Sequence, residues 1–274
     1  MGNYQDIVEI GVFDNETILF EGQFPIPEGI SYNSYVIIDE KIAVMDSVDV
    51  RFADQWLSNL EDALQGKTPD YLVIQHMEPD HSGSIQQFIQ TYPQTKLVGN
   101  TKTFTMLKNY FGSDYSENQL MVKNGDTLPL GIRTLTFVFA PMVHWPEVMM
   151  TYDSASKILF SADAFGTFGP RETTTSWIDE ARRYYFGIVA PYGKQVQALF
   201  KKLTAYDIQA LYPLHGPVLE SDISPYIAAY KTWSTYEAEE DGVTLVYSSV
   251  YGHTEKAINT LVQMTKDKGR SIAV

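Results

Sequence analysis

The stretch QHMEPDHSGS at residues 75–84 places four side chains that can bind a metal within six positions: His76, Glu78, Asp80 and His81. Two of the chain's five histidines lie here. Imidazole nitrogens and carboxylate oxygens are common protein ligands of zinc, iron and manganese. If the preceding strand continues to Gln75, strand alternation predicts that His76, Glu78 and Asp80 converge on one side, while His81 is directed to a neighbouring site.

Three more candidate ligands follow predicted strands elsewhere in the chain: His144, Asp163 and His215. Loops at strand ends commonly carry active-site residues, because the strands hold them rigidly. Seven protein ligands are too many for one tetrahedral zinc and suit two metal ions roughly 3.5–4 Å apart that share a carboxylate. The chain has no cysteine, so any metal must be held by nitrogen and oxygen, which suits iron or manganese as well as zinc.

The elements that must position these residues alternate between strand and helix, as judged from apolar periods of two and of 3.6 residues. A hairpin that turns at residues 39–41 comes first. It is followed by predicted strands at 71–76, 96–100, 134–146, 157–166 and 208–215 and by predicted helices at 51–66, 84–93, 101–111 and 193–207. Four of these strands end at or near a candidate ligand.

Composition narrows the class of protein. The chain has 274 residues, a net charge of −14 and 44% hydrophobic residues. That charge argues against nucleic acid or an anionic membrane as the main partner, because both would repel it. No segment is apolar for long enough to span a bilayer, and the N-terminus lacks a basic region followed by an apolar run. We therefore expect a soluble cytoplasmic protein.

The pattern H-x-E-x-D-H at 76–81, with strand-end His, Asp and His, resembles the metallo-β-lactamase fold. Hydrolases of that fold usually show H-x-H-x-D-H, and the carboxylate at Glu78 is similar to that of flavodiiron proteins. The segments GISYNSYVI near the start, HWPE at 144–147, SADAFG at 161–166 and PLHG at 213–216 fit the same family. The resemblance implies an α+β fold, with a metallo-β-lactamase-like αββα sandwich followed by the start of a flavodoxin-like α/β domain.

The resemblance also implies roles for the seven side chains. His76, Glu78 and His144 would hold one iron, Asp80, His81 and His215 the other, and Asp163 would bridge the two. Tyr192 and Trp145 are candidates for lining the metal pocket, and Tyr192 also for hydrogen-bonding a metal-bound substrate.

A second motif lies in VYSSVYGHTEKA at 246–257, where a strand, a Ser/Gly/Thr loop and a helix could cradle a phosphate. After a di-iron domain it resembles the FMN phosphate loop of a flavodoxin domain, with Ser249, Tyr251, Gly252, His253 and Thr254 at the matching positions. The polar run at 237–241 predicts a boundary, so that residues 1–240 form the di-iron domain and 241–274 the first piece of an FMN-binding domain. We expect the chain to be a fragment of a longer protein.

The function that the resemblance implies is reduction of O2 to water, of NO to N2O, or of both. Electrons would pass from an external donor, such as rubredoxin or a reductase, through FMN to two iron ions. A head-to-tail homodimer or a tetramer would bring the flavin of one subunit to the irons of another. Two other functions stay open, a dinuclear zinc hydrolase of the metallo-β-lactamase fold and a sensor that binds O2 or NO.

Overall fold

The computed structural model describes residues 6–113, 115–172 and 177–274. The chain divides into two compact units, Met1–Thr235 and Tyr236–Val274. The division falls just before the acidic run at which the sequence predicts a boundary. Among the described residues, no helix combines the length and the apolar character that crossing a bilayer requires.

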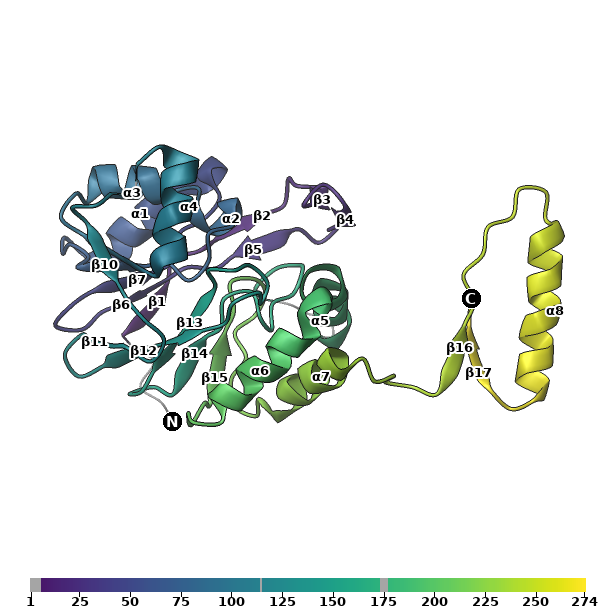
Figure 1. Cartoon of the computed structure of the whole chain (residues 1–274). Coiled ribbons are helices and arrows are strands. Elements are labelled where there is room, and N and C mark those ends of the chain that lie inside the picture. Colours follow the sequence, from purple (N-terminus) through teal and green to yellow (C-terminus); the bar gives the residue numbers. More distant parts are fainter. Residues whose placement is uncertain (1–5, 114, 173–176) are drawn as a thin grey trace. The chain divides into compact units, whose positions relative to one another are not determined.

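The first unit is built on two mixed sheets (Figure 1). The six-stranded sheet has the order β1 (Ile7–Glu9), β6 (Tyr35–Ile37), β7 (Ala43–Met45), β8 (Tyr71–Val73), β9 (Lys96–Gly99) and β10 (Gln119–Met121). The five-stranded sheet has the order β11 (Thr127–Pro129), β12 (Thr134–Phe139), β13 (Met149–Asp153), β14 (Ile158–Phe160) and β15 (Ala210–Tyr212). Two short pairs, β2 (Val12–Asp14) with β5 (Ile30–Tyr32) and β3 (Leu19–Phe20) with β4 (Phe24–Pro25), complete the strands described in this unit.

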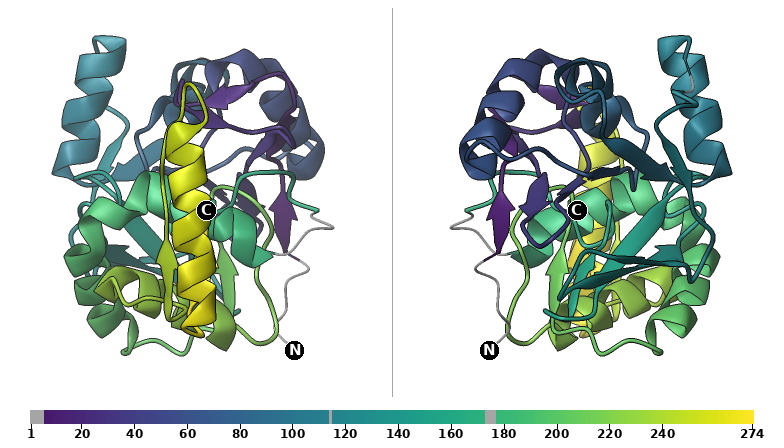
Figure 2. Two further views of the ribbon diagram at one scale, coloured as in Figure 1. Left: turned by 90° about the vertical axis from the view of Figure 1, so that its right-hand side faces the viewer. Right: turned by 90° about the vertical axis from the view of Figure 1, so that its left-hand side faces the viewer.

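Helices cover the outer face of each sheet, as Figure 2 shows from two sides. Those beside the six-stranded sheet are the 3-10 turn η1 (Val50–Phe52), α1 (Ala53–Leu64), α2 (Pro79–Ser82), α3 (Ile85–Thr91) and α4 (Thr101–Phe111). Those beside the five-stranded sheet are α5 (Trp177–Tyr184), the π-helical turn η2 (Tyr185–Val189), the 3-10 turn η3 (Ala190–Tyr192), α6 (Gly193–Leu203) and α7 (Ser224–Thr235).

Strand alternation explains the layers. Along β6 and β7, Val36 and Val44 pack in the core that also contains Trp56 of α1, while Tyr35 and Met45 pack in a separate core. That second core contains side chains from both sheets and none from the helices. Because successive strand residues point to opposite faces, each central strand is buried on both sides. The first unit is therefore an αββα sandwich, as the resemblance to the metallo-β-lactamase fold implies.

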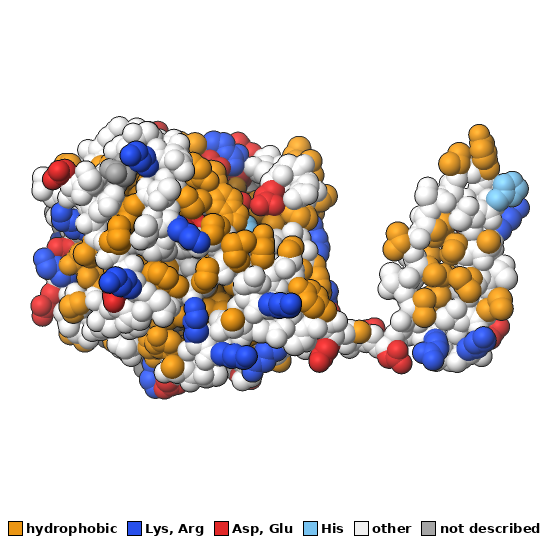
Figure 3. Space-filling view, in the orientation of Figure 1, with side chains coloured by type: hydrophobic (Ala, Val, Ile, Leu, Met, Phe, Trp, Pro, Cys, Tyr) orange, Lys and Arg blue, Asp and Glu red, His pale blue; other side chains and the backbone are white. Residues whose placement is uncertain are grey.

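The second unit has one strand–helix–strand motif: β16 (Gly242–Thr244), α8 (His253–Asp267) and β17 (Ser271–Ala273). The two strands pair in parallel. None of the residues 236–274 is buried. Figure 3 shows hydrophobic side chains and a histidine at the surface of this unit.

The predicted elements are present, with shorter strands. The hairpin of β6 and β7 pairs antiparallel, and α1, α3, α4 and α6 lie in the predicted helical ranges. The predicted strand 134–146 ends at Phe139, so His144 lies in the following loop and does not end the strand. The helices α5 and α7 were not predicted. In α7, only Tyr230, Trp233 and Ser234 are buried. Three residues are too few to produce a recognisable helical period in the sequence.

Candidate metal centre

Four strands bring the candidate ligands to one edge of the sandwich. In the five-stranded sheet, β12 and β14 are each antiparallel to β13, and β15 is parallel to β14. Their carboxyl ends therefore lie at the same edge, where His144, Asp163 and His215 follow them. The six-stranded sheet contributes the loop after β8, which carries the other four candidates. All seven are buried, with exposed fractions of at most 8%.

The first group of side chains consists of His76, Glu78, His144 and Asp163, whose possible ligand atoms lie within 4.8 Å of one another. The Nε2 atoms of His76 and His144 lie 3.2 and 3.1 Å from Glu78 Oε2. The same two nitrogens lie 3.2 and 2.9 Å from Asp163 Oδ2. Two imidazoles and two carboxylates thus face one common point.

The second group consists of Asp80, His81 and His215. The Nε2 atoms of the two histidines are 3.0 Å apart and lie 3.3 and 3.4 Å from Asp80 Oδ2. They also face Asp163 Oδ1, at 3.5 and 3.9 Å. Asp163 therefore directs one oxygen to each group, which is the arrangement of a bridging carboxylate.

The loop after β8 does not continue the strand alternation, and the prediction that Asp80 joins His76 and Glu78 on one side is wrong. Helix α2 begins at Pro79, the first helical position, where a proline's missing N–H costs nothing. The helical turn rotates Asp80 and His81 together toward the second group, while Glu78, just before the helix, stays with the first. One short segment thereby supplies both positions.

The cluster fits two cations. Both carboxylate oxygens of Asp80 and both of Asp163 are buried, and apart from the imidazoles of the cluster they have no hydrogen-bond partner among the described residues. Buried, unpaired carboxylate oxygens are costly unless a cation satisfies them. Nitrogen and oxygen ligands with several carboxylates suit iron, manganese or zinc. The binding of metal by these seven residues stays a prediction, and this geometry supports it.

The pKa shifts in the cluster also indicate that its carboxylates favour a positive charge between them. Burial raises the pKa of Asp80 well above its usual value, and the carboxylates of Glu78 and Asp163 add to the effect. Burial lowers the pKa of His144, but the hydrogen bonds that its Nε2–H donates to Asp163 and Glu78 outweigh this effect and raise the pKa to about 9. The two carboxylates thus stabilise a proton on His144, at the point that Glu78 and Asp163 both face. A metal ion must displace it on binding.

A neighbouring carboxylate fixes the loop where it leaves β8. Asp46, which follows the parallel strand β7, accepts hydrogen bonds through Oδ1 from the N–H groups of Gln75 and His76, at 2.7 and 3.2 Å. Its Oδ2 accepts from the side-chain amide of Gln75 at 2.9 Å. Burial raises the pKa of Asp46 to about 7, although these hydrogen bonds oppose the shift. The sequence analysis did not identify this residue.

The segments GISYNSYVI and PLHG meet at His215. Asn33 donates from Nδ2 to the carbonyl oxygens of Pro213 and Gly216, at 2.9 and 2.8 Å. His215 Nδ1 lies 2.8 Å from the Ser31 carbonyl oxygen, which directs Nε2 to the metal cluster. Gly216 has a φ of +75°, and a Cβ there would collide with Thr167 Oγ1. The two segments are therefore one structural unit that orients a single imidazole.

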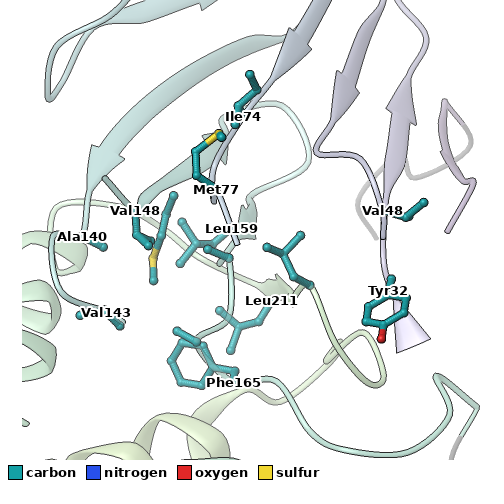
Figure 4. Close-up of a cluster of buried hydrophobic side chains, with 14 of the residues drawn as sticks. Tyr32, Val48, Ile74, Met77, Ala140, Val143, Val148, Leu159, Phe165 and Leu211 are labelled. Atoms are coloured by element: carbon teal, nitrogen blue, oxygen red, sulfur yellow. The ribbon is translucent and has the colours of Figure 1, made fainter. Parts of the chain in front are cut away.

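Apolar and aromatic side chains pack beside the cluster. Figure 4 shows buried hydrophobic side chains of this core, among them Met77, Val143 and Phe165, which lie within two residues of candidate ligands in the sequence. Trp145 packs edge-on against His76, with ring centroids 5.3 Å apart, and against His144 at 6.0 Å. Its predicted place beside the pocket agrees with these contacts. Such packing excludes water and strengthens electrostatic interactions beside it.

Among the described residues, the tyrosines whose rings contact histidines of the cluster are Tyr32 and Tyr184, and not Tyr192. Tyr192 is half-buried at the end of η3, and no interaction among the described residues joins it to the seven candidates. Tyr184 is buried, and its ring centroid lies 5.5 Å from that of His215. Burial raises the pKa of Tyr184 well above its usual value, with Asp163 adding to the shift, so the phenol keeps its proton. The π-helical turn after α5 separates the two tyrosines, and the sequence pattern gave no sign of it.

The predicted phosphate loop lies in the second unit. Ser249, Tyr251 and Gly252 precede α8, and His253 and Thr254 begin it. Gly252 has a φ of +78°, and the Ser249 hydroxyl accepts a hydrogen bond from the Glu255 N–H at 3.4 Å. This geometry leaves the first turn of the helix open to solvent and is compatible with an anion there. Phosphate binding by these five residues stays a prediction.

Comparison with known proteins identifies the family of this chain. A family model described as "ODP family beta lactamase" matches residues 30–216, a range that contains all seven candidate ligands. The anaerobic nitric oxide reductase flavorubredoxin of Aliivibrio fischeri is 32% identical to this chain over 277 residues, which is 97% of this chain and 55% of the relative. The chain belongs to the flavodiiron protein family. It spans about half the length of the curated relatives it matches.

Solved flavodiiron proteins share the fold. The flavodiiron protein of Giardia intestinalis superimposes with a TM-score of 0.89 at 30% identity, over 98% of this chain and 67% of that one. The rubredoxin:oxygen oxidoreductase of Desulfovibrio gigas does so with a TM-score of 0.88 at 27% identity, over 100% of this chain and 70% of that one. The αββα sandwich of the first unit is therefore the flavodiiron form of the metallo-β-lactamase-like fold.

Proposed function

We propose that this chain provides the di-iron centre of a flavodiiron oxidoreductase that reduces O2 to water, NO to N2O, or both. The observation that carries the proposal is the buried set of seven nitrogen and oxygen donors in two groups, with Asp163 directed to both and the Glu78 carboxylate in the first. The names of the A. fischeri relative and of the D. gigas structure support an oxidoreductase of this kind.

In this proposal, His76, Glu78 and His144 hold one iron, Asp80, His81 and His215 hold the other, and Asp163 bridges. Two iron ions held here would supply the electrons and the open coordination positions that a small gas molecule needs. The protein orients the donors, excludes water with the apolar side chains beside the cluster, and keeps the Tyr184 phenol protonated beside His215. Iron is favoured over zinc because Glu78 replaces an imidazole with a harder, charged oxygen ligand.

The second unit fits the electron-transfer half of the proposal. The loop before α8 would bind the phosphate of FMN, with Ser249, Tyr251, Gly252, His253 and Thr254 around it. Electrons would come from an external donor such as rubredoxin or a reductase. A head-to-tail homodimer or a tetramer would bring the flavin of one subunit close to the irons of another. The cofactor would then supply the electron relay while the protein fixes its position.

A comparison of metals tests the function directly. The chain is loaded anaerobically with Fe²⁺ or with Zn²⁺, and each sample is mixed with O2 or NO in a gas-sensing electrode. We expect rapid consumption of at least one gas by the iron-loaded chain and none above buffer by the zinc-loaded chain. Equal consumption by the two samples would refute the proposal. Ester or thioester hydrolysis by the zinc-loaded chain, with an inert iron form, would favour the zinc hydrolase instead.

A further inference from the structure

The hydrogen bonds behind the two groups of ligands are unequal. His76 Nδ1 lies 2.8 Å from Glu147 Oε1, and both side chains are fully buried. In the second group, His215 Nδ1 lies 2.8 Å from a neutral acceptor, the Ser31 carbonyl oxygen. His81 Nδ1 is buried and has no hydrogen-bond partner among the described residues. Among the described residues, a carboxylate therefore faces the outer nitrogen, Nδ1, of an imidazole in the first group only.

Glu147 is itself held firmly. The oxygen that faces His76 also accepts a hydrogen bond from the Met77 N–H at 2.8 Å. The carbonyl oxygen of Glu147 accepts one from Asn100 Nδ2 at 2.6 Å. Glu147 thus ties the loop after β8 to the loop between β12 and β13, and it fixes both the tautomer and the angle of the His76 ring. Such outer carboxylates orient a ligating imidazole and increase its basicity.

The second group lacks comparable support. Both carboxylate oxygens of Asp80 are without a hydrogen-bond partner among the described residues, so nothing outside the cluster orients them. His81 is positioned by packing, with its ring edge-on to Tyr32 at a centroid distance of 6.3 Å. In the described part of the chain, the Nδ1 atoms of His81 and His215 face no charged acceptor, in contrast to the Nδ1 atom of His76. An ion here therefore relies on ligands that are less rigid and less electron-rich.

We propose that the two metal positions fill and empty in a fixed order, with Glu147 as the positioning residue that makes the His76 position the tighter one. The first ion binds between His76, Glu78, His144 and Asp163, and the ion beside His81 and His215 leaves first. This inference rests on the proposed function only in that the centre holds two ions.

Release of Co²⁺ tests the order. The 274-residue chain is loaded with Co²⁺, mixed with excess EDTA, and followed by the visible absorption of bound cobalt. We expect two phases of one ion each. Glu147→Gln keeps an oxygen acceptor for the two N–H groups but removes the charge, and we expect it to accelerate the slow phase by about 10–100-fold. The fast phase should change by less than about twofold.

Two kinds of variant assign the phases. His215→Ala should abolish the fast phase and leave the slow one, and His76→Ala should do the reverse. Asp153→Asn is the matched control, because Asp153 is a buried carboxylate of the same unit that is paired with Arg133 and not with a candidate ligand. It should leave both phases unchanged. If Glu147→Gln fails to fold, the order of release in these variants still decides the proposal.

Several results would overturn the inference. These are a single release phase in the wild type, loss of the slow phase in His215→Ala, or equal acceleration of both phases by Glu147→Gln, which is what a merely structural role would produce. Failure of the proposed function looks different. A chain that binds neither Co²⁺ nor Fe²⁺ refutes both proposals, whereas a chain that binds two ions and releases them together refutes only the order.

Discussion

Both units of the chain place polar groups on a loop between a strand and a helix, but the two loops differ in burial. The loop after β8 has its ligands within a sandwich of two sheets, and His76 and His81 are fully buried. The loop before α8 is exposed, and Tyr251 retains 87% of its accessible surface. The metal centre is thus a product of tertiary packing from four strands. The phosphate loop is a local product of one strand, one glycine and one helix.

The largest effect should come from the bridging carboxylate. Asp163→Ala removes the one ligand that faces both groups, so we expect metal content to fall from about two ions per chain to fewer than about 0.5. His215→Ala should retain about one ion, because a terminal imidazole serves one position only. Metal analysis after gel filtration measures both. Equal losses in the two variants would mean that Asp163 does not bridge.

The second unit should not retain flavin when it is present only as residues 236–274. The loop can offer N–H groups to a phosphate, but a flavin ring needs an apolar pocket that encloses most of its surface, and no residue of this unit is buried. We expect fewer than about 0.1 FMN per chain after incubation with excess FMN and gel filtration. The metal content of the same sample is the internal control. Stoichiometric FMN would contradict this prediction, because it would show that residues 236–274 form a complete flavin site despite their exposure.

Replacement of Glu78, the carboxylate that distinguishes this chain from the hydrolases, should change which metal the protein prefers without abolishing metal binding. Glu78→His restores the ligand pattern of the hydrolases, so competition between equal Fe²⁺ and Zn²⁺ under anaerobic conditions should shift toward zinc by about tenfold or more. Consumption of O2 or NO should fall with the iron content. Glu61→His, at an exposed position on α1, is the control and should change neither. An unchanged iron content together with unchanged gas consumption in Glu78→His would show that Glu78 is not a ligand.

A matched pair of leucines compares the packing of the two units. Leu60 on α1 is fully buried, whereas Leu261 on α8 is 44% exposed. Leu60→Ala should lower the free energy of unfolding by about 2–5 kcal/mol, because it removes core contacts and leaves a cavity. Leu261→Ala should change it by less than about 0.5 kcal/mol. Denaturant unfolding followed by circular dichroism measures both, and comparable losses would contradict the contrast in packing.

Much of the centre could be predicted from residue types, because a chain without cysteine offers few ways to bind two metals. The strands that precede Asp163 and His215 can be recognised in the sequence as short apolar runs. The grouping of Asp80 was not predictable from alternation, because Pro79 starts a helical turn. Tyr184 and Glu147 could not be assigned, because their contacts with His215 and His76 join segments that are distant in the sequence.

The origin of the ligands has a mechanical consequence. The six-stranded sheet supplies His76, Glu78, Asp80 and His81, and the five-stranded sheet supplies the other three, so each metal position has ligands from both sheets. A bound ion is therefore a cross-link between the two halves of the sandwich, in a chain that has no disulfide. Like a disulfide, it closes long loops and restricts the unfolded chain. If the seven residues bind metal as proposed, metal loading should hold the two sheets together at this edge, and chelation should loosen them from one another.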